Sequence, residues 1–131
     1  MNTFKTHGAF SWSELMTSDP AAALRFYTAL LGWRSEKMAM PDGEYHVLKV
    51  GDTAVGGVMA IPPEAKAGGM PPNWGCYVTV DDVDATARKA TELGGKVVHG
   101  PQDIQGVGRM AVIVDPQGAT LNVITYTMPA G

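Results

Sequence analysis

The stretch TSDPAAALRFYTALLGW, at residues 17–33, carries the clearest structural signal in the chain. Asp19 can accept hydrogen bonds from the free amide groups at a helix start, and Pro20 suits the first helical position. Gly32 can adopt the left-handed conformation that commonly ends a helix. The spacing of the apolar residues therefore predicts a helix over residues 21–31.

The same layout returns in the stretch VDDVDATARKATELGG at residues 80–95. Asp82 takes the place of Asp19 at the helix start, and Gly94-Gly95 provides the stop. An extended segment precedes each helix and strands follow it, so each half is predicted to have the order βαβββ. Aligning the two aspartates superposes the halves, and an internal repeat of this length predicts a duplicated architecture.

The strands are predicted from alternating apolar residues and from turn residues between them. They cover residues 10–16, 45–50, 53–61, 75–80, 109–114 and 119–126, with shorter strands near 35–38 and 96–99. We expect one α+β domain over residues 1–131, made of module one (about 8–61), a proline- and glycine-rich linker (62–72) and module two (about 73–127). Residues 101–108 are expected to form a flap or a surface loop.

Composition excludes several classes of function. Ten basic and thirteen acidic residues are scattered without blocks, so no nucleic-acid partner is expected. No apolar run approaches the roughly 20 residues of a membrane span, so no membrane partner is expected. The single cysteine, Cys76, and the absence of a signal peptide favour a cytoplasmic location. Strand alternation predicts that Cys76 faces the helices as an inert core thiol.

Short motifs add a family resemblance. They are Ser18-Asp19-Pro20, Phe26-Tyr27 and Leu30 to Trp33 in module one, and Val80 to Thr86, Leu93 to Gly95, Gly106 to Arg109 and Asp115 to Ala119 in module two. With these motifs the chain resembles the vicinal oxygen chelate superfamily, which includes glyoxalase I, extradiol dioxygenases and bleomycin-resistance proteins, and within it an uncharacterised glyoxalase-like branch. The resemblance implies a curved mixed sheet with a concave cavity, and a homodimer.

The resemblance also implies four metal-binding positions, which fall here at Trp12, Gly57, Gly75 and Asn122. Only Asn122 offers even a weak oxygen ligand, whereas a family-type site needs three or four strong donors. We therefore expect no metal and no cofactor, and neither glyoxalase I nor dioxygenase activity.

Strand alternation predicts what the cavity contains in place of the metal. With Trp12 facing the cavity, Glu14 faces it too. If the turn at Gly51-Asp52 is a two-residue hairpin, His46 lies opposite Gly57, and by the same count Glu44 lies opposite Met59. Glu14 and His46 are then the candidate acid–base residues.

The corresponding count in module two places Ala111 opposite Asn122 and Arg109 opposite Ile124. The predicted ligand-binding residues share an inward strand face, and they are Trp12, Met59, Tyr77, Arg109, Asn122, Ile124 and Tyr126. Their aromatic, apolar and polar groups are typical of a small-molecule pocket.

Three functions remain open. The first is binding of a small organic molecule, planar and aromatic or cationic, without a metal. The second is a metal-independent isomerase, lyase or epimerase in which Glu14 and His46 exchange protons with a substrate. The third is a degenerate metalloenzyme using Glu14, His46 and a backbone or water ligand. Each residue also has a structural interpretation, in which Trp12 fills the core and Glu14 pairs with Arg109 or His46.

Overall fold

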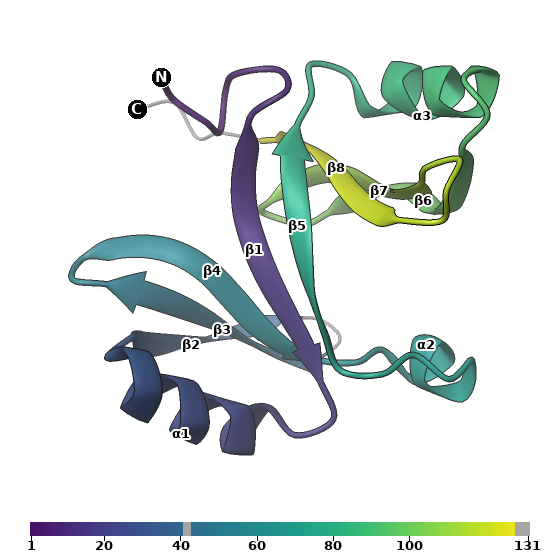
Figure 1. Ribbon diagram of the computed structural model, residues 1–131. Coiled ribbons are helices and arrows are strands. Elements are labelled where there is room, and N and C mark those ends of the chain that lie inside the picture. The colour runs from purple at the N-terminus through teal and green to yellow at the C-terminus, as the bar shows by residue number, and fades with distance from the viewer. Residues whose placement is uncertain (41–42, 128–131) are drawn as a thin grey trace. The chain divides into compact units, whose positions relative to one another are not determined.

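The computed structural model describes residues 1–40 and 43–127, and over these residues the chain forms three helices and eight strands (Figure 1). In chain order they are β1 (Phe10–Thr17), α1 (Pro20–Leu31), β2 (Arg34–Met40), β3 (Gly43–Val50), β4 (Thr53–Ala60), α2 (Pro63–Ala67), β5 (Asn73–Thr79), α3 (Val83–Glu92), β6 (Lys96–Ile104), β7 (Gly108–Val114) and β8 (Thr120–Tyr126). The α+β class and the repeated βαβββ order are confirmed, with the short helix α2 added between the repeats.

The chain divides into two compact units, which do not coincide with the two sequence repeats. One unit is residues 12–75, and the other joins residues 1–11 to the chain from residue 76 onward. Strands β1 and β5 each begin in one unit and end in the other. Each unit therefore contains residues from both halves of the sequence.

The unit of residues 12–75 has a four-stranded sheet in the order β2-β3-β4-β1. The β1–β4 pair is parallel and the others are antiparallel. Helix α1 covers one face of this sheet (Figure 1), where Leu24 and Tyr27 pack on a buried cluster of Leu15, Leu48 and Val58. The opposite face carries the even-numbered residues of β1, because successive side chains of a strand alternate between the two faces.

The other unit has the sheet order β5-β8-β7-β6, again with one parallel pair, β5–β8. Helix α3 covers one face, where Val83 joins Val80, Ala111 and Val123 in a second buried cluster. Residues 101–104, expected in a flap or loop, instead continue β6. The expectation of a loop over this segment was therefore wrong.

Helices α1 and α3 begin and end close to where the sequence predicts. The Asp19 carboxylate accepts a hydrogen bond from the amide of Ala22 at 3.0 Å, and the Asp82 carboxylate accepts one from Ala85 at 3.1 Å. Gly32 ends α1 in the left-handed conformation, with φ of 72°. These side-chain caps satisfy amide groups that have no partner inside the helix.

The predicted pairing of β3 with β4 was wrong by one residue. The turn is as predicted, since Val50 pairs with Thr53 and Lys49 with Ala54, but a β-bulge follows in which Val55 has no partner of its own. His46 consequently lies opposite Val58, and Tyr45 takes the place opposite Met59 that was predicted for Glu44. A slip of one residue moves every later side chain to the other face of the sheet.

The predicted pairing of β7 with β8 was also wrong by one residue. The Asp115 carboxylate accepts hydrogen bonds from the amides of Gln117 and Ala119, which closes a loop with an odd number of residues. As a result Ala111 pairs with Val123 and Arg109 pairs with Thr125. Both residues lie on the face covered by α3.

Cys76 is exposed, so its predicted burial in the core was wrong. No helix within residues 1–40 and 43–127 has the length and apolar character that a bilayer span requires.

Candidate functional site

The candidate site lies on the face of the 12–75 sheet that is turned away from α1. Glu14 pairs with Gly57, and Gly57 pairs with Val47 on its other side. Tyr45 and Met59 form another pair on this face. Glu14 therefore lies on the strand face that alternation predicts. Its neighbour on β4 is Gly57, one of the four positions that the family resemblance implies for a metal.

Three side chains on this face are joined by hydrogen bonds. The indole N–H of Trp12 donates to the Tyr45 hydroxyl at 2.8 Å, and that hydroxyl donates to Oε2 of Glu14, also at 2.8 Å. The Glu14 residue is 8% exposed. A carboxylate is costly to bury, and a charge-assisted hydrogen bond offsets part of that cost. Tyr45 therefore both orients the Trp12 ring and stabilises the Glu14 carboxylate.

Gly57 makes room for this arrangement. A β-carbon built at Gly57 would overlap the ring and hydroxyl of Tyr45. Tyr45 occupies the space above Gly57 that a side chain at this position would fill. The place of Tyr45 on this face could not be predicted from the sequence, because the turn between β3 and β4 does not reveal the bulge in β4.

His46 lies on the opposite face from Glu14, because it pairs with Val58 of the α1-facing cluster. Its Nε2 atom is 3.6 Å from Oε2 of Glu44, whose other oxygen is 2.8 Å from Nζ of Lys37. The hydrogen bond and charge of Lys37, with a smaller effect of His46, lower the pKa of the Glu44 carboxyl. The predicted placement of His46 beside Glu14 was therefore wrong.

In the other unit, the sheet face turned away from α3 carries Tyr77, Asn122, Ile124 and Tyr126. Tyr77 pairs with Asn122, and Ile124 pairs with Thr79 and Met110. Tyr77 and Ile124 are buried. These four predicted residues therefore share one face.

The chain before β1 packs on this same face. The Thr79 hydroxyl donates to the carbonyl of Thr3 at 2.6 Å, and the Phe4 ring meets Tyr126 edge to face at 5.0 Å between centroids. The Tyr126 hydroxyl is also 2.7 Å from Oγ of Ser11. Phe4, an aromatic residue in an otherwise polar segment, was the available sequence signal for this contact.

Arg109 lies on the α3 side, where it joins β7 to the helix. Its guanidinium donates to both Asp84 oxygens, at 2.7 and 2.9 Å, and to Asp103 at 3.1 Å. The Arg109 hydrogen bond lowers the pKa of the Asp84 carboxyl, and the two aspartates raise the pKa of Arg109. The predicted inward placement of Arg109 opposite Ile124 was therefore wrong.

The four positions implied for a metal do not fit one. The Trp12 indole nitrogen carries a hydrogen, which it donates to Tyr45. Gly57 and Gly75 have no side chain, and Asn122 supplies one neutral amide. Within residues 1–40 and 43–127, no three His, Cys, Asp or Glu side chains are grouped so that they could hold a metal ion.

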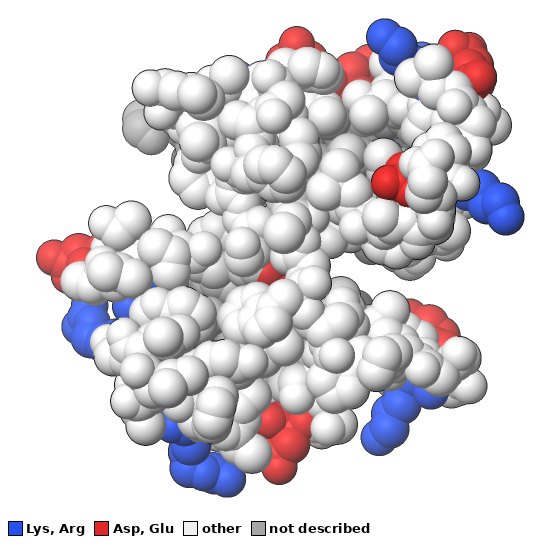
Figure 2. All heavy atoms as spheres, viewed as in Figure 1, with Lys and Arg blue, Asp and Glu red and all other residues white. Residues whose placement is uncertain are grey.

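Charged side chains are dispersed over the face of the molecule that Figure 2 shows. On the face seen in Figure 2, lysine and arginine side chains are interspersed with aspartate and glutamate, and uncharged residues cover most of the surface. This face therefore offers no broad patch of one sign of charge to a polyanion.

Comparison with known sequences identifies relatives over most of the chain. "Putative glyoxylase CFP32" of Mycobacterium tuberculosis is 47% identical over 118 residues, which are 89% of this chain and 44% of that protein. "Anthracycline biosynthesis protein DnrV" of Streptomyces peucetius is 35% identical over 127 residues, covering 88% of this chain and 46% of that protein. The chain thus spans about half the length of the curated relatives it matches.

Solved structures share the fold at low sequence identity. Methylmalonyl-CoA epimerase from Mycobacterium tuberculosis is similar with a TM-score of 0.65 and 20% identity, covering 95% of this chain and 89% of the epimerase. A methylmalonyl-CoA epimerase in complex with methylmalonyl-CoA and NH4+ has a TM-score of 0.66 at 16% identity, covering 93% and 96%.

The family itself is shown by sequence. The model of the Glyoxalase/Bleomycin resistance protein/Dioxygenase superfamily matches residues 9–123, which include both βαβββ repeats. The chain therefore belongs to the Glyoxalase/Bleomycin resistance protein/Dioxygenase superfamily.

Proposed function

We propose that this chain binds a planar small organic molecule on the sheet face that carries Trp12, Tyr45 and Glu14, and that it does so without a metal. The observation that supports the proposal most is the hydrogen-bonded row from Trp12 through Tyr45 to Glu14. This row stands where the family resemblance implies a metal, and it provides an aromatic surface next to a polar group.

The chemistry of these side chains suits such a ligand. Small-molecule sites are mostly apolar, with a few polar groups that fix orientation. The Trp12 indole offers a flat surface for stacking, and the Met59 thioether can adapt to an aromatic ring. The relative DnrV is named for anthracycline biosynthesis, and anthracyclines are built on a planar ring system.

Calorimetry with 1,8-dihydroxyanthraquinone as the probe tests the proposal. We expect binding that is the same with and without a chelator. Trp12→Leu removes the stacking surface and is expected to weaken binding at least about tenfold, since aromatic contacts of this kind contribute on the order of 1 kcal/mol beyond their buried area.

Phe26→Leu is the matched control, because Phe26 is an exposed aromatic residue of α1, which covers the opposite face of this sheet. Equal losses in the two variants, or binding that the chelator abolishes, would contradict the proposal. A probe that binds neither wild type nor variant would also contradict it for planar quinones.

A second candidate function is an isomerase, lyase or epimerase that uses Glu14 for proton transfer. It is favoured by the hydrogen bond from Tyr45 to Glu14, which gives the carboxylate a hydroxyl partner in place of the His46 first expected. A carboxylate held next to a substrate can remove an acidic C–H proton. The fold shared with methylmalonyl-CoA epimerases makes methylmalonyl-CoA the natural probe.

Deuterium exchange separates this candidate from simple binding. We expect the chain to exchange the acidic C–H of methylmalonyl-CoA in D2O, as followed by NMR, and Glu14→Gln to abolish the exchange while probe affinity stays within about threefold. Exchange that persists in Glu14→Gln would remove Glu14 as the base. Exchange that stops when a chelator is added would favour a degenerate metalloenzyme instead.

We also propose that the chain forms a homodimer through the outer face of α1. Phe26, Leu30 and Leu31 are exposed there, and contiguous apolar surface on a helix is typical of an interface. Light scattering should give twice the chain mass for wild type and a single chain mass for Leu30→Glu. A monomeric wild type would contradict the dimer.

A cytoplasmic location is proposed as well. Cys76 is an exposed free thiol, and reducing compartments preserve such thiols. Cell fractionation with an antibody to the chain tests this, and recovery from the secreted fraction would contradict it.

A further inference from the structure

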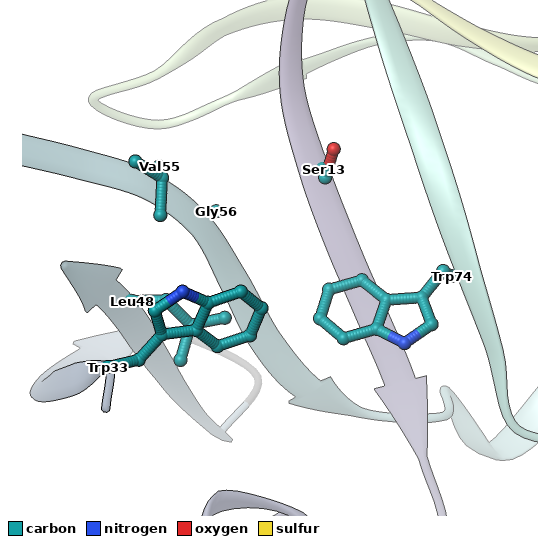
Figure 3. Close-up of a pocket in the computed structure, with 6 residues that line it drawn as sticks. All are labelled: Ser13, Trp33, Leu48, Val55, Gly56 and Trp74. Atoms are coloured by element: carbon teal, nitrogen blue, oxygen red, sulfur yellow. The ribbon is translucent and has the colours of Figure 1, made fainter. Parts of the chain in front are cut away.

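A hollow lies in the 12–75 unit, on the α1 side of the sheet and therefore on the opposite face from Glu14. Its volume is about 250 Å³. It is lined by residues from β1, the link between α1 and β2, both strands of the bulged hairpin and the start of β5. These residues are Ser13, Trp33, Leu48, Val55, Gly56 and Trp74 (Figure 3). None of these side chains carries a charge.

Two tryptophans form the walls, and tyrosine fixes both of them. Figure 3 shows the two indole rings extending toward each other, and their centroids are 6.1 Å apart at 73°, which is an edge-to-face contact at the border of the hollow. The Trp74 N–H donates to the Tyr27 hydroxyl at 3.2 Å, while Trp33 stacks on the Tyr27 ring at 6.0 Å. The aromatic walls are therefore held in place by side chains of the same unit.

The β-bulge and a glycine leave space open beside the two tryptophans. Val55 is the extra residue of the bulge and lines the hollow. Gly56 has no side chain, and a β-carbon there would lie 2.5 Å from the carbonyl oxygen of Ser13. Bulges often redirect a side chain beside a functional site. The close approach of β1 to β4 thus requires glycine at the position that also leaves this space empty.

We propose that this hollow is a second binding site, for a neutral planar aromatic molecule of one or two rings. The volume lies between the roughly 150 Å³ cavity that accepts benzene and the roughly 300–1,000 Å³ sites that accept drug-sized ligands. The uncharged lining selects against ions, and two indoles at a steep angle give a ring both a face and an edge to contact.

One polar group adds a preference within this class. The Trp33 indole N–H has no hydrogen-bond acceptor among the residues that the structure describes, whereas the Trp74 N–H is bound to Tyr27. A ligand with an acceptor atom on its ring edge can accept a hydrogen bond from Trp33. The preferred ligand therefore carries a ring nitrogen or oxygen as acceptor.

Quinoline and indole are the probes that test this site, because both are neutral bicyclic molecules near pH 8 and only quinoline has a ring acceptor. We expect both to shift the NMR signals of the Trp33 and Trp74 indole N–H groups and to leave that of Trp12 in place. Quinoline is expected to bind about threefold to tenfold more tightly than indole, as one added hydrogen bond allows.

Four variants complete the test. Val55→Phe fills the hollow and is expected to weaken both probes at least about tenfold, while Val50→Phe, the same exchange at an exposed strand end outside the lining, leaves them unchanged. Trp33→Phe is expected to abolish the preference for quinoline. Trp12→Leu is expected to leave both probes unchanged, because Trp12 is outside the lining, and this separates the site from the proposed function.

Any of three results would overturn the site. Neither probe binds at millimolar concentration, or Val55→Phe binds the probes as wild type does, or the shifts of the NMR signals are confined to Trp12. A preference for quinoline that survives in Trp33→Phe overturns the assigned hydrogen bond.

Discussion

At the scale of single residues, Gly57 and Tyr45 depend on each other. The Tyr45 hydroxyl reaches Glu14 only because Gly57 has no β-carbon beneath the ring. A glycine that is required by a neighbouring side chain differs from one required by backbone conformation, and Gly57 does not have a positive φ. Its substitution therefore tests packing alone.

Gly57→Ala is expected to destabilise the protein by about 1–3 kcal/mol, because Tyr45 must move out of a well-packed position. The Trp12 indole N–H signal should shift as its acceptor is displaced. Urea denaturation and NMR measure the two effects. Gly68→Ala is the control, since a β-carbon there makes only ordinary contacts. Equal stability of Gly57→Ala and wild type would contradict the packing argument.

The sequence predicts which face of a strand a residue occupies better than it predicts which residue pairs with it on the next strand. Alternation along β1 alone places Trp12 and Glu14 on one face, and Glu14 does pair with Gly57. Tyr45 could not be identified, because its position depends on the bulge at Val55 on the neighbouring strand. Local alternation survives such irregularities, whereas pairing between strands does not.

At the scale of elements, the two helices have equivalent caps. Asp19 and Asp82 each accept one amide hydrogen bond three residues along. Asp19→Ala and Asp82→Ala are each expected to lower the free energy of unfolding by about 1 kcal/mol. Ser18→Ala, beside the first cap, is the control and should be neutral. Thermal unfolding measures all three variants, and a capping variant as stable as Ser18→Ala would refute the equivalence.

The Arg109–Asp84 pair joins β7 to α3 and makes stability depend on pH. Because Arg109 lowers the pKa of Asp84 in the folded state, the stabilisation is fully present above the ordinary aspartate pKa and is lost as pH falls through the lowered value. Below about pH 4, wild type should therefore lose stability more steeply than Asp84→Asn. Urea midpoints measured against pH test this.

Asp52→Asn serves as the control for that experiment, since it removes a fully exposed aspartate from the turn between β3 and β4. Its pH dependence should follow that of wild type. Parallel curves for Asp84→Asn and wild type would mean that the pair does not contribute in this range.

The sequence also predicts where helices and strands lie more reliably than it predicts how the strands pair. Helix starts and stops are local, so Asp19 and Gly32 suffice to locate α1. The loop before β8 has an odd number of residues because Asp115 binds two amides at once, and a proline-glycine turn of this composition permits either count. The face assigned to Arg109 was wrong for this reason, and the face assigned to His46 was wrong because of the bulge at Val55. Neither error arose from a missed strand.

At the scale of the whole molecule, the tryptophans report on one unit. Trp12, Trp33 and Trp74 all lie within residues 12–75. A unit of about 60 residues is marginal on its own, so we expect both units to unfold together. Tryptophan fluorescence and far-ultraviolet circular dichroism should then give the same urea midpoint. A fluorescence transition that precedes the circular dichroism transition would contradict this.

The division of β1 and β5 between the two units also constrains synthesis on the ribosome. The unit that starts at Met1 contains Phe4, whose ring packs on Tyr126 near the far end of the described chain. That unit cannot be completed until β8 has left the exit tunnel. The 12–75 unit is contiguous and emerges earlier, whereas the other unit must wait for β8 before it can close.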